Sequence, residues 1–138
     1  MNRNHRLQAV LLTGASCFSG LALSAPTYLE CFVSDSSARR DFTVTLDESR
    51  GTASHKSETG AGFNAQAIFS ANTVVYQNTD VASGIRMTFR YEIDRTTLEL
   101  SLLFTAAPVD PSTEAVIGTR RVESLGRCSL APVPERKF

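Results

Sequence analysis

The side chains of this chain that could do chemistry are few, and their order in the sequence suits no common catalytic set. A serine or cysteine nucleophile needs a base beside it, most often histidine. Beyond residue 24 the chain holds one histidine, His55, which stands between Ser54 and Lys56. These polar neighbours predict an exposed loop, so we do not expect His55 to act as a base. Zinc requires three or four ligands, which one histidine and two cysteines that can pair with each other do not supply.

Paired carboxylates are the other arrangement that could support catalysis, as they do in glycosidases. Asp47 is followed directly by Glu48, and Glu92 and Asp94 are two residues apart. In a strand the first two would point to opposite faces, whereas the second two would share an outer face with two arginines. Both pairs are typical of turns and solvated faces, and the glycines form no phosphate-binding fingerprint. We therefore expect a protein that is not an enzyme and that uses no cofactor and no metal.

The first 24 residues have the pattern of an export signal. Two arginines precede a largely apolar segment over residues 7–23, and Ala22 and Ser24 place small residues at −3 and −1 of a cut after Ser24. The segment is too short and too polar to be a good membrane span. We expect a cleavable signal peptide over 1–24 and a periplasmic or secreted protein of bacterial type. Lipid attachment at Cys17 is an alternative.

Two cysteines, Cys31 and Cys128, stand near the two ends of the chain that would follow the signal. An even pair in an oxidising compartment is most simply a disulfide. The bridge would close a loop of nearly the whole domain, for which the chain-entropy account gives roughly 4–5 kcal/mol. We therefore expect one β-domain over 25–131, closed by this bridge, and a flexible tail over 132–138.

The net charge of the chain excludes some partners. Lysine plus arginine and aspartate plus glutamate both number 14, and two of the arginines lie within the predicted signal, so the remaining chain carries a net charge of −2. This balance gives no electrostatic reason to expect nucleic acid or anionic lipid as a partner. We also expect no stable membrane insertion of the mature chain.

The hydrophobic pattern of the chain has a period of two, most clearly over residues 85–104. Two alternating runs, 85–94 and 98–104, flank a polar corner and predict a long antiparallel hairpin. Further strands are predicted over 28–33, 42–47, 52–55, 63–69, 73–77, 115–122 and 125–130, with loops over 56–62 and 105–114 and no helix outside the leader. This spacing predicts an all-β fold, a small antiparallel barrel or sandwich of seven or eight strands.

Arginines on the predicted outer faces are the candidate recognition residues. Arg86 and Arg90 lie on the outer face of the first hairpin strand, and Arg120 and Arg121 lie near the end of the chain. One interpretation is that these arginines pair with acids across strands and keep the sheet soluble, at a few tenths of a kcal/mol per pair. The other is a surface that binds a second protein, since arginine is common at the centres of interfaces.

Two resemblances accompany these patterns. The run Tyr91–Leu100, with Ile93-Asp94-Arg95 before Thr97, is similar to an I-D-R-x-T-G-x-L hairpin of small secreted bacterial proteins of unassigned function, which share an early cysteine and a closing Gly-x-Cys. Here Leu98 stands where glycine is usual. In size, export and disulfide closure the chain also resembles periplasmic inhibitors of c-type lysozyme. Ser83-Gly84 is similar to the start of their inhibitory loop, but the expected tyrosine and tryptophan-bearing half are missing.

Two functional hypotheses of different classes follow. The first is an exported module that binds another protein, such as an inhibitor or immunity protein of a hydrolase or toxin. The second is a lipocalin-like barrel that binds a small ligand in its interior, which requires a hollow, apolar-lined cavity. The bulky inward residues favour a filled barrel, so the first hypothesis is preferred, and a structural role in the envelope is a further alternative.

Overall fold

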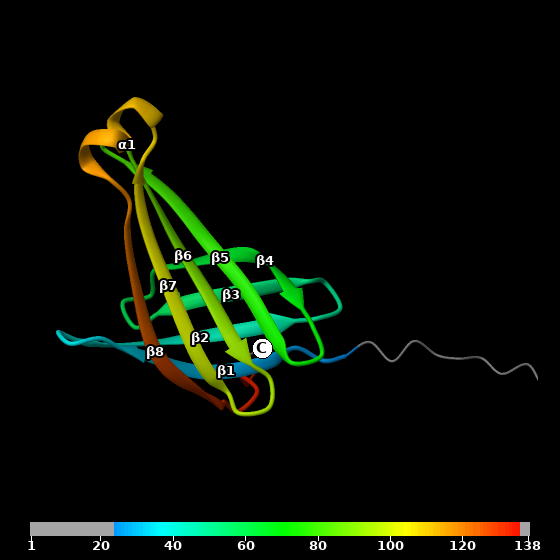
Figure 1. The fold of residues 1–138 in the computed structure, drawn as a ribbon. Helices are drawn as coiled ribbons and strands as arrows, with labels where there is room; N and C mark the ends of the chain where they lie inside the picture. Colours follow the sequence, from blue (N-terminus) through cyan, green and yellow to red (C-terminus); the bar gives the residue numbers. More distant parts are fainter. Residues whose placement is uncertain (1–23, 136–138) are drawn as a thin grey trace, which may run out of the picture.

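The computed structural model describes residues 24–135, so most of the predicted signal peptide and the last three residues lie outside the described residues. Eight antiparallel strands close into a barrel in which each strand pairs with its neighbours in chain order and the last pairs with the first (Figure 1). The strands are β1 (Thr27–Ser34), β2 (Arg39–Asp47), β3 (Thr52–Ser57), β4 (Gly62–Phe69), β5 (Thr73–Ala82), β6 (Ile85–Asp94), β7 (Glu99–Pro108) and β8 (Arg120–Leu130), and one helix, α1 (Pro111–Ile117), precedes β8.

The alternation of apolar and polar residues explains why these segments form strands around one core. In β6 and β7, Tyr91, Ile93, Leu100 and Leu102 are buried, and their neighbours in the strand are more exposed. Inward side chains from the other strands fill the remaining space, as expected for a barrel of eight strands, whose interior is just wide enough for side chains. The prediction of an all-β antiparallel fold is confirmed, and the barrel is the correct one of the two architectures.

The barrel closes along a seam between β1 and β8. Cys31 and Cys128 face each other in register with their Cα atoms 4.0 Å apart, and the predicted disulfide between them joins positions 97 residues apart. Next to it, a Cβ atom on Gly126 would lie 1.8 Å from the carbonyl oxygen of Phe32. Only glycine allows the two strands to approach this closely. The seam therefore depends on the Gly-x-Cys sequence as a unit.

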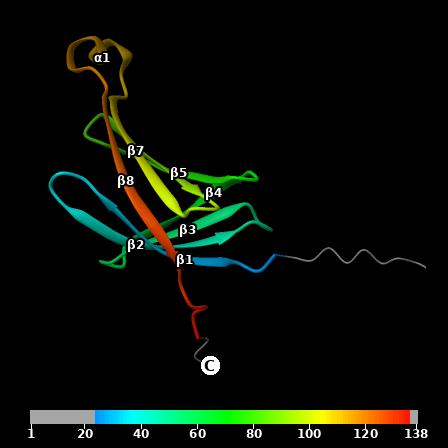
Figure 2. The same ribbon diagram turned by 60° about the horizontal axis from the view of Figure 1, so that its bottom comes forward.

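The strands differ in length, and this difference shapes the molecule. Strands β5–β8 have 10 or 11 residues and β3 has 6. Beyond Tyr76, β5 has no partner on β4, and before Leu125, β8 has none on β1, within the described chain. Figures 1 and 2 show the far halves of β5–β8 extending past the short strands, with α1 at their tip. We call residues 78–89 and 104–124 the projecting sheet.

The predicted strand over 115–122 is wrong. β7 continues to Pro108, and most of the expected strand is instead helix α1 and the turn that follows it. Asp110 caps the helix by accepting a hydrogen bond from the backbone N–H of Ser112, and Pro111 occupies the first turn, a combination that starts helices. The apolar side chains of α1 are exposed, so the alternation of apolar residues in this segment does not indicate a buried strand.

Candidate binding site at the mouth of the barrel

The two ends of the barrel are built differently. At one end, which we call the mouth, the projecting sheet overhangs the turns that join β1 to β2 and β3 to β4. At the other, which we call the closed end, the turns after β2, β4 and β6 lie together. Each end holds a pocket with apolar lining and an arginine, so each is a candidate binding site.

The pocket at the mouth has a volume of about 300 Å³. We call it the mouth pocket. Its buried lining residues are Val33, Phe42, His55, Tyr91 and Leu102. Its more exposed lining includes Phe89 of the projecting sheet, the first three residues of β2 (Arg39, Arg40 and Asp41) and Glu58 of the turn after β3. The pocket therefore combines an apolar interior with a charged rim.

His55 lies at the centre of a layer of rings beneath this pocket. Its imidazole is sandwiched between Phe42, at 4.3 Å between ring centroids, and Phe63, at 4.8 Å. Its Nδ1 atom is 3.2 Å from the hydroxyl of Tyr76, and the ring of Tyr76 stacks on that of Tyr91 at 4.9 Å. Five aromatic side chains from strands β2–β6 thus fill the barrel below its opening, which gives the pocket a rigid floor.

The prediction of an exposed loop around His55 is wrong. Strand β3 runs to Ser57, two residues further than expected, and in it Ala53 and His55 point inward while Ser54 and Lys56 point outward. His55 is 8% exposed. Burial lowers the pKa of His55 to about 4, so the ring is neutral at neutral pH.

Two polar atoms of the pocket lining have no hydrogen-bond partner among residues 24–135. Tyr91 is 7% exposed, and its hydroxyl hydrogen-bonds to no atom of residues 24–135; the same holds for Nε2 of His55. No side-chain nitrogen or oxygen that is fully buried lacks a partner within this range, so both atoms are accessible to solvent, and both of their residues line the pocket. Hydrogen-bonding groups at this depth are usually satisfied, which makes the two atoms candidate ligand contacts.

Arg40 supplies a positive charge at the rim of the pocket that Tyr91 and His55 line. It precedes Phe42 by two residues in β2 and lies opposite Val33, so it belongs to the inward-facing set at the very mouth. Burial raises the pKa of Tyr91, and the positive charge of Arg40 acts against this rise. Its one ion pair within the described residues is with Asp35, at 3.3 Å, and its side chain is half exposed. Arg40 therefore keeps donors for another anion.

The arginines predicted as partner-binding residues do not share one face. By strand alternation Arg86, Arg90 and Arg121 lie on the outer face of β6 and β8, whereas Arg120 belongs to the inner set opposite Ala106. All four arginines are exposed, and Arg90 forms an ion pair with the neighbouring Glu92 at 3.2 Å. The four candidate arginines are thus divided between the two faces of the sheet.

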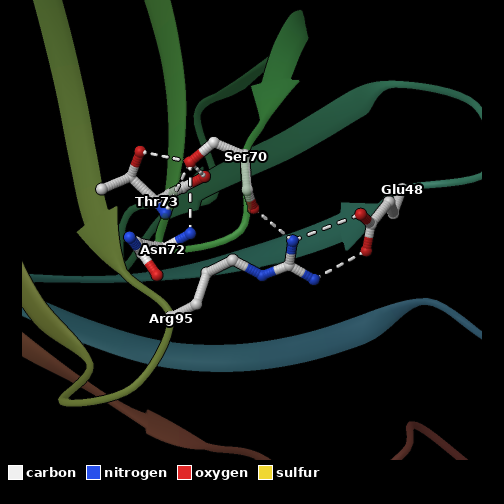
Figure 3. A network of polar contacts seen from close by, with 5 residues as sticks. All are labelled: Glu48, Ser70, Asn72, Thr73 and Arg95. Atoms are coloured by element: carbon white, nitrogen blue, oxygen red, sulfur yellow. Dashed lines mark hydrogen bonds and ion pairs between the residues drawn. The ribbon is translucent and has the colours of Figure 1, made fainter.

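At the closed end, both terminal nitrogens of one arginine, Arg95, donate hydrogen bonds (Figure 3). The guanidinium of Arg95 donates to both carboxylate oxygens of Glu48, at 3.2 and 2.7 Å, and to the carbonyl oxygen of Ser70, at 2.6 Å. The backbone N–H of Arg95 donates to the carbonyl of Asn72 at 2.8 Å. These contacts tie together the turns after β2, β4 and β6. An apolar pocket of about 360 Å³ lies beside the Arg95–Glu48 ion pair.

The carboxylate pairs considered from the sequence have structural partners. The carboxylate of Asp47 accepts hydrogen bonds from the hydroxyl of Ser49 and the N–H of Arg50, and Asp94 accepts two backbone N–H groups in its own turn. Glu48 and Glu92 are held in the ion pairs given above. Among residues 24–135, no three potential metal ligands gather in one place.

Comparison with known proteins adds no identity: no protein-family model, no curated protein and no solved structure matches this chain. The two resemblances drawn from the sequence stay predictions. None of the helices in the described part of the chain has the length and apolar character needed to cross a membrane. The functional argument therefore rests on the geometry of the barrel.

Proposed function

We propose that this chain is an exported protein-binding module that binds another protein through its projecting sheet. The observation that carries the proposal is a row of half-buried apolar side chains on the inner face of the projecting sheet. The row consists of Ile85, Met87, Phe89, Phe104 and Val122. Phe89 and Phe104 contact each other at 4.9 Å between ring centroids, and the shorter strands do not reach across this face.

The shape of the surface favours a protein over a small molecule. The row extends from the mouth pocket toward α1, where Val116 and Ile117 are 85% and 64% exposed. A contiguous apolar surface with aromatic residues and an arginine beside it is typical of interfaces between proteins. Arg120 supplies that arginine on the inner side of β8, next to Val122. An enzyme inhibitor or immunity protein that inserts its projecting sheet into a cleft is the form of this function that we favour.

The interior of the barrel supports the same choice. Tyr76, Leu29, Ile93, Leu100 and Leu102 are each 2% exposed or less, so side chains occupy the space that a lipocalin-like chamber would leave open. Rigidity also fits a protein that plugs a cleft, because a preformed surface loses little conformational entropy on binding. The seam disulfide between β1 and β8 contributes to that rigidity.

A crosslinking experiment in the producing cells tests the proposal. A photoreactive amino acid at Met87 should yield one discrete crosslinked protein in the exported fraction, whereas the same group at Thr43, on the exposed outer face of β2, should not. In copurification, Met87→Glu should lose that partner, and Leu125→Glu, which adds the same charge on the outer face of β8, should keep it. Crosslinks of equal yield at both positions, or none at Met87, would contradict the proposal.

A further inference from the structure

From the geometry of the mouth pocket we infer that it binds a small planar molecule with an aromatic body and one carboxylate group. This inference goes beyond protein binding by the projecting sheet and does not depend on it. The aromatic body would lie against Phe42 and Tyr91, and the carboxylate would meet Arg40 at the rim.

The size and lining of the pocket set the class of the ligand body. A volume of about 300 Å³ is at the lower end of the range for ligand sites and suits one ring system rather than a long chain. Phe42 is 6% exposed and Leu102 is 2% exposed, and the ring layer around His55 fixes the floor in place. Flat rings are recognised well by such walls, since aromatic pairs add about 0.5–1.5 kcal/mol beyond the area that they bury.

The two unpartnered polar atoms set the hydrogen-bonding pattern. The Tyr91 hydroxyl and Nε2 of His55 are accessible to solvent and belong to two side chains that are more than nine-tenths buried and that line the pocket. Because the His55 ring is neutral, it supplies a hydrogen-bonding atom and no charge. A ligand that reached the floor could pair with both atoms, which find no partner within the described part of the chain.

The charges at the rim select an anion at the position of Arg40. Four charged side chains line the pocket, and two of them neutralise each other: Arg39 donates to Asp41 from Nε and from a terminal nitrogen, at 2.7 to 3.0 Å. Glu58 acts on Arg39, whose pKa it helps to raise. Among the described residues Arg40 is left with a single 3.3 Å contact, to Asp35, and that carboxylate also accepts two backbone N–H groups and a hydroxyl in its turn. A carboxylate is the anion that best matches a guanidinium fork.

The pocket at the closed end lacks this selectivity. Its arginine, Arg95, donates to Glu48 and Ser70 from both terminal nitrogens, so a bidentate ion pair already balances the charge that an incoming carboxylate would need. We therefore expect the two pockets to differ in their affinity for the same carboxylate. A carboxylate should bind at the mouth and not at the closed end.

Fluorescence titration of the mature, disulfide-closed protein with indole-3-acetate tests the inference. The chain has no tryptophan, so the indole ring of the probe can be excited selectively. Indole-3-acetamide, which has nearly the same shape without the charge, is the matched probe. We expect one site per chain and about tenfold tighter binding of the acetate, the difference that a charge-assisted hydrogen bond makes.

Three variants locate the site. Arg40→Gln should bring the affinity for the acetate down to that for the acetamide, and Tyr91→Phe should weaken both probes several-fold. Arg50→Gln removes an equally positive, 80% exposed side chain at the closed end and should change nothing. Circular dichroism of each variant should match the parent, since Arg40 is half exposed and phenylalanine retains the ring at position 91.

Four outcomes would overturn the inference. They are no binding of either probe at millimolar concentration, equal affinity for the two probes, equal loss of binding in Arg50→Gln and Arg40→Gln, and loss of binding in Arg95→Gln with binding retained in Arg40→Gln. The last result would assign the site to the closed end.

Discussion

The two ends of this barrel contain the same kinds of groups but differ in how many hydrogen-bond partners these groups have. Each has an apolar pocket with an arginine beside it, yet Arg95 at the closed end has three acceptor contacts on its guanidinium and Arg40 at the mouth has one long contact. The turns at both ends form hydrogen bonds of their own, but the lining of the mouth also leaves the Tyr91 hydroxyl and Nε2 of His55 without partners in residues 24–135. The hydrogen-bond partners of these groups thus distinguish the closed end, whose turns are joined to one another, from the mouth, which has polar groups free to bind a ligand.

This difference has a physical reason. A network of satisfied polar groups fixes the positions of the turns that it joins, because each bond restricts the others. A polar atom left open beside apolar walls adds little to the stability of the fold and is available for a ligand. We therefore expect changes at the closed end to alter stability and changes at the rim of the mouth to alter binding, with His55, which is buried below the rim, as the exception.

The largest expected effect comes from that exception. Burial holds the pKa of His55 at about 4, below its value of 6.5 in an unfolded chain, so the unfolded state binds a proton first as the pH falls. Stability is fully present above pH 6.5 and is lost as the pH drops toward 4, by roughly 3 kcal/mol in total. Urea denaturation of the mature protein at pH 7, 5.5 and 4 measures this loss.

A double variant isolates the histidine from the carboxylates. His55→Phe with Tyr76→Phe keeps the ring layer, removes the titrating group and avoids leaving the Tyr76 hydroxyl without its partner. Its stability should change much less than that of the parent between pH 7 and 5. Turn carboxylates with lowered pKa values, such as Asp35 at about 2, destabilise the fold at lower pH and do so in both proteins. Equal slopes for parent and variant in this range would show that His55 is not buried in its neutral form.

The second prediction compares the two arginines directly. Arg95→Met should lower the free energy of unfolding by about 1–2 kcal/mol, because it removes an exposed ion pair and a charged hydrogen bond to the Ser70 carbonyl. Arg40→Met should lower it by less than about 0.5 kcal/mol, since its single contact to Asp35 is long and half exposed. Denaturant melts of both variants at pH 7 measure the difference. A larger loss for Arg40→Met would reverse our assignment of the stabilising and the available end.

Much of the fold could be predicted because burial in this barrel follows the local alternation of the sequence. The long hairpin over 85–104 places Ile93 and Leu100 inside as expected, and the two cysteines lie opposite each other once β1 and β8 close the sheet. The helix α1 could not be predicted from alternation, because its apolar residues face solvent. The Asp110-Pro111 pair, a helix start signal, is the feature of the sequence that indicates α1.

The candidate site was beyond reach of such patterns. The mouth pocket exists because β5–β8 are longer than the strands opposite them, and because Arg40, His55 and Tyr91 come to one place from three strands. No short motif joins residues so far apart in the chain. Within β3 the polar neighbours of His55 suggested a loop. Ala53, two residues earlier, is also buried and fits the alternation that places His55 inside the barrel. Strand length and register, rather than residue type, therefore determined the site.

The smallest expected effect concerns a strained position at the closed end. Leu98 follows the turn capped by Asp94 and has φ +58°, the left-handed conformation that usually calls for glycine after this kind of turn. Its side chain packs partly against the core, which compensates for a backbone cost of about 1 kcal/mol. Leu98→Ala loses the packing and keeps the cost, whereas Leu98→Gly loses both. We therefore expect Leu98→Gly to be more stable than Leu98→Ala by about 1 kcal/mol.

A second pair of variants provides the control. At Leu103, in the middle of β7 and outside the left-handed region, the order should be the usual one, with alanine more stable than glycine by about 0.5–1 kcal/mol. Chemical denaturation of all four proteins gives the two differences with opposite signs. The same sign at both positions would mean that the closed end adopts another turn in solution. In that case Leu98 would not have the left-handed backbone conformation, and the closed end would not be strained at this position.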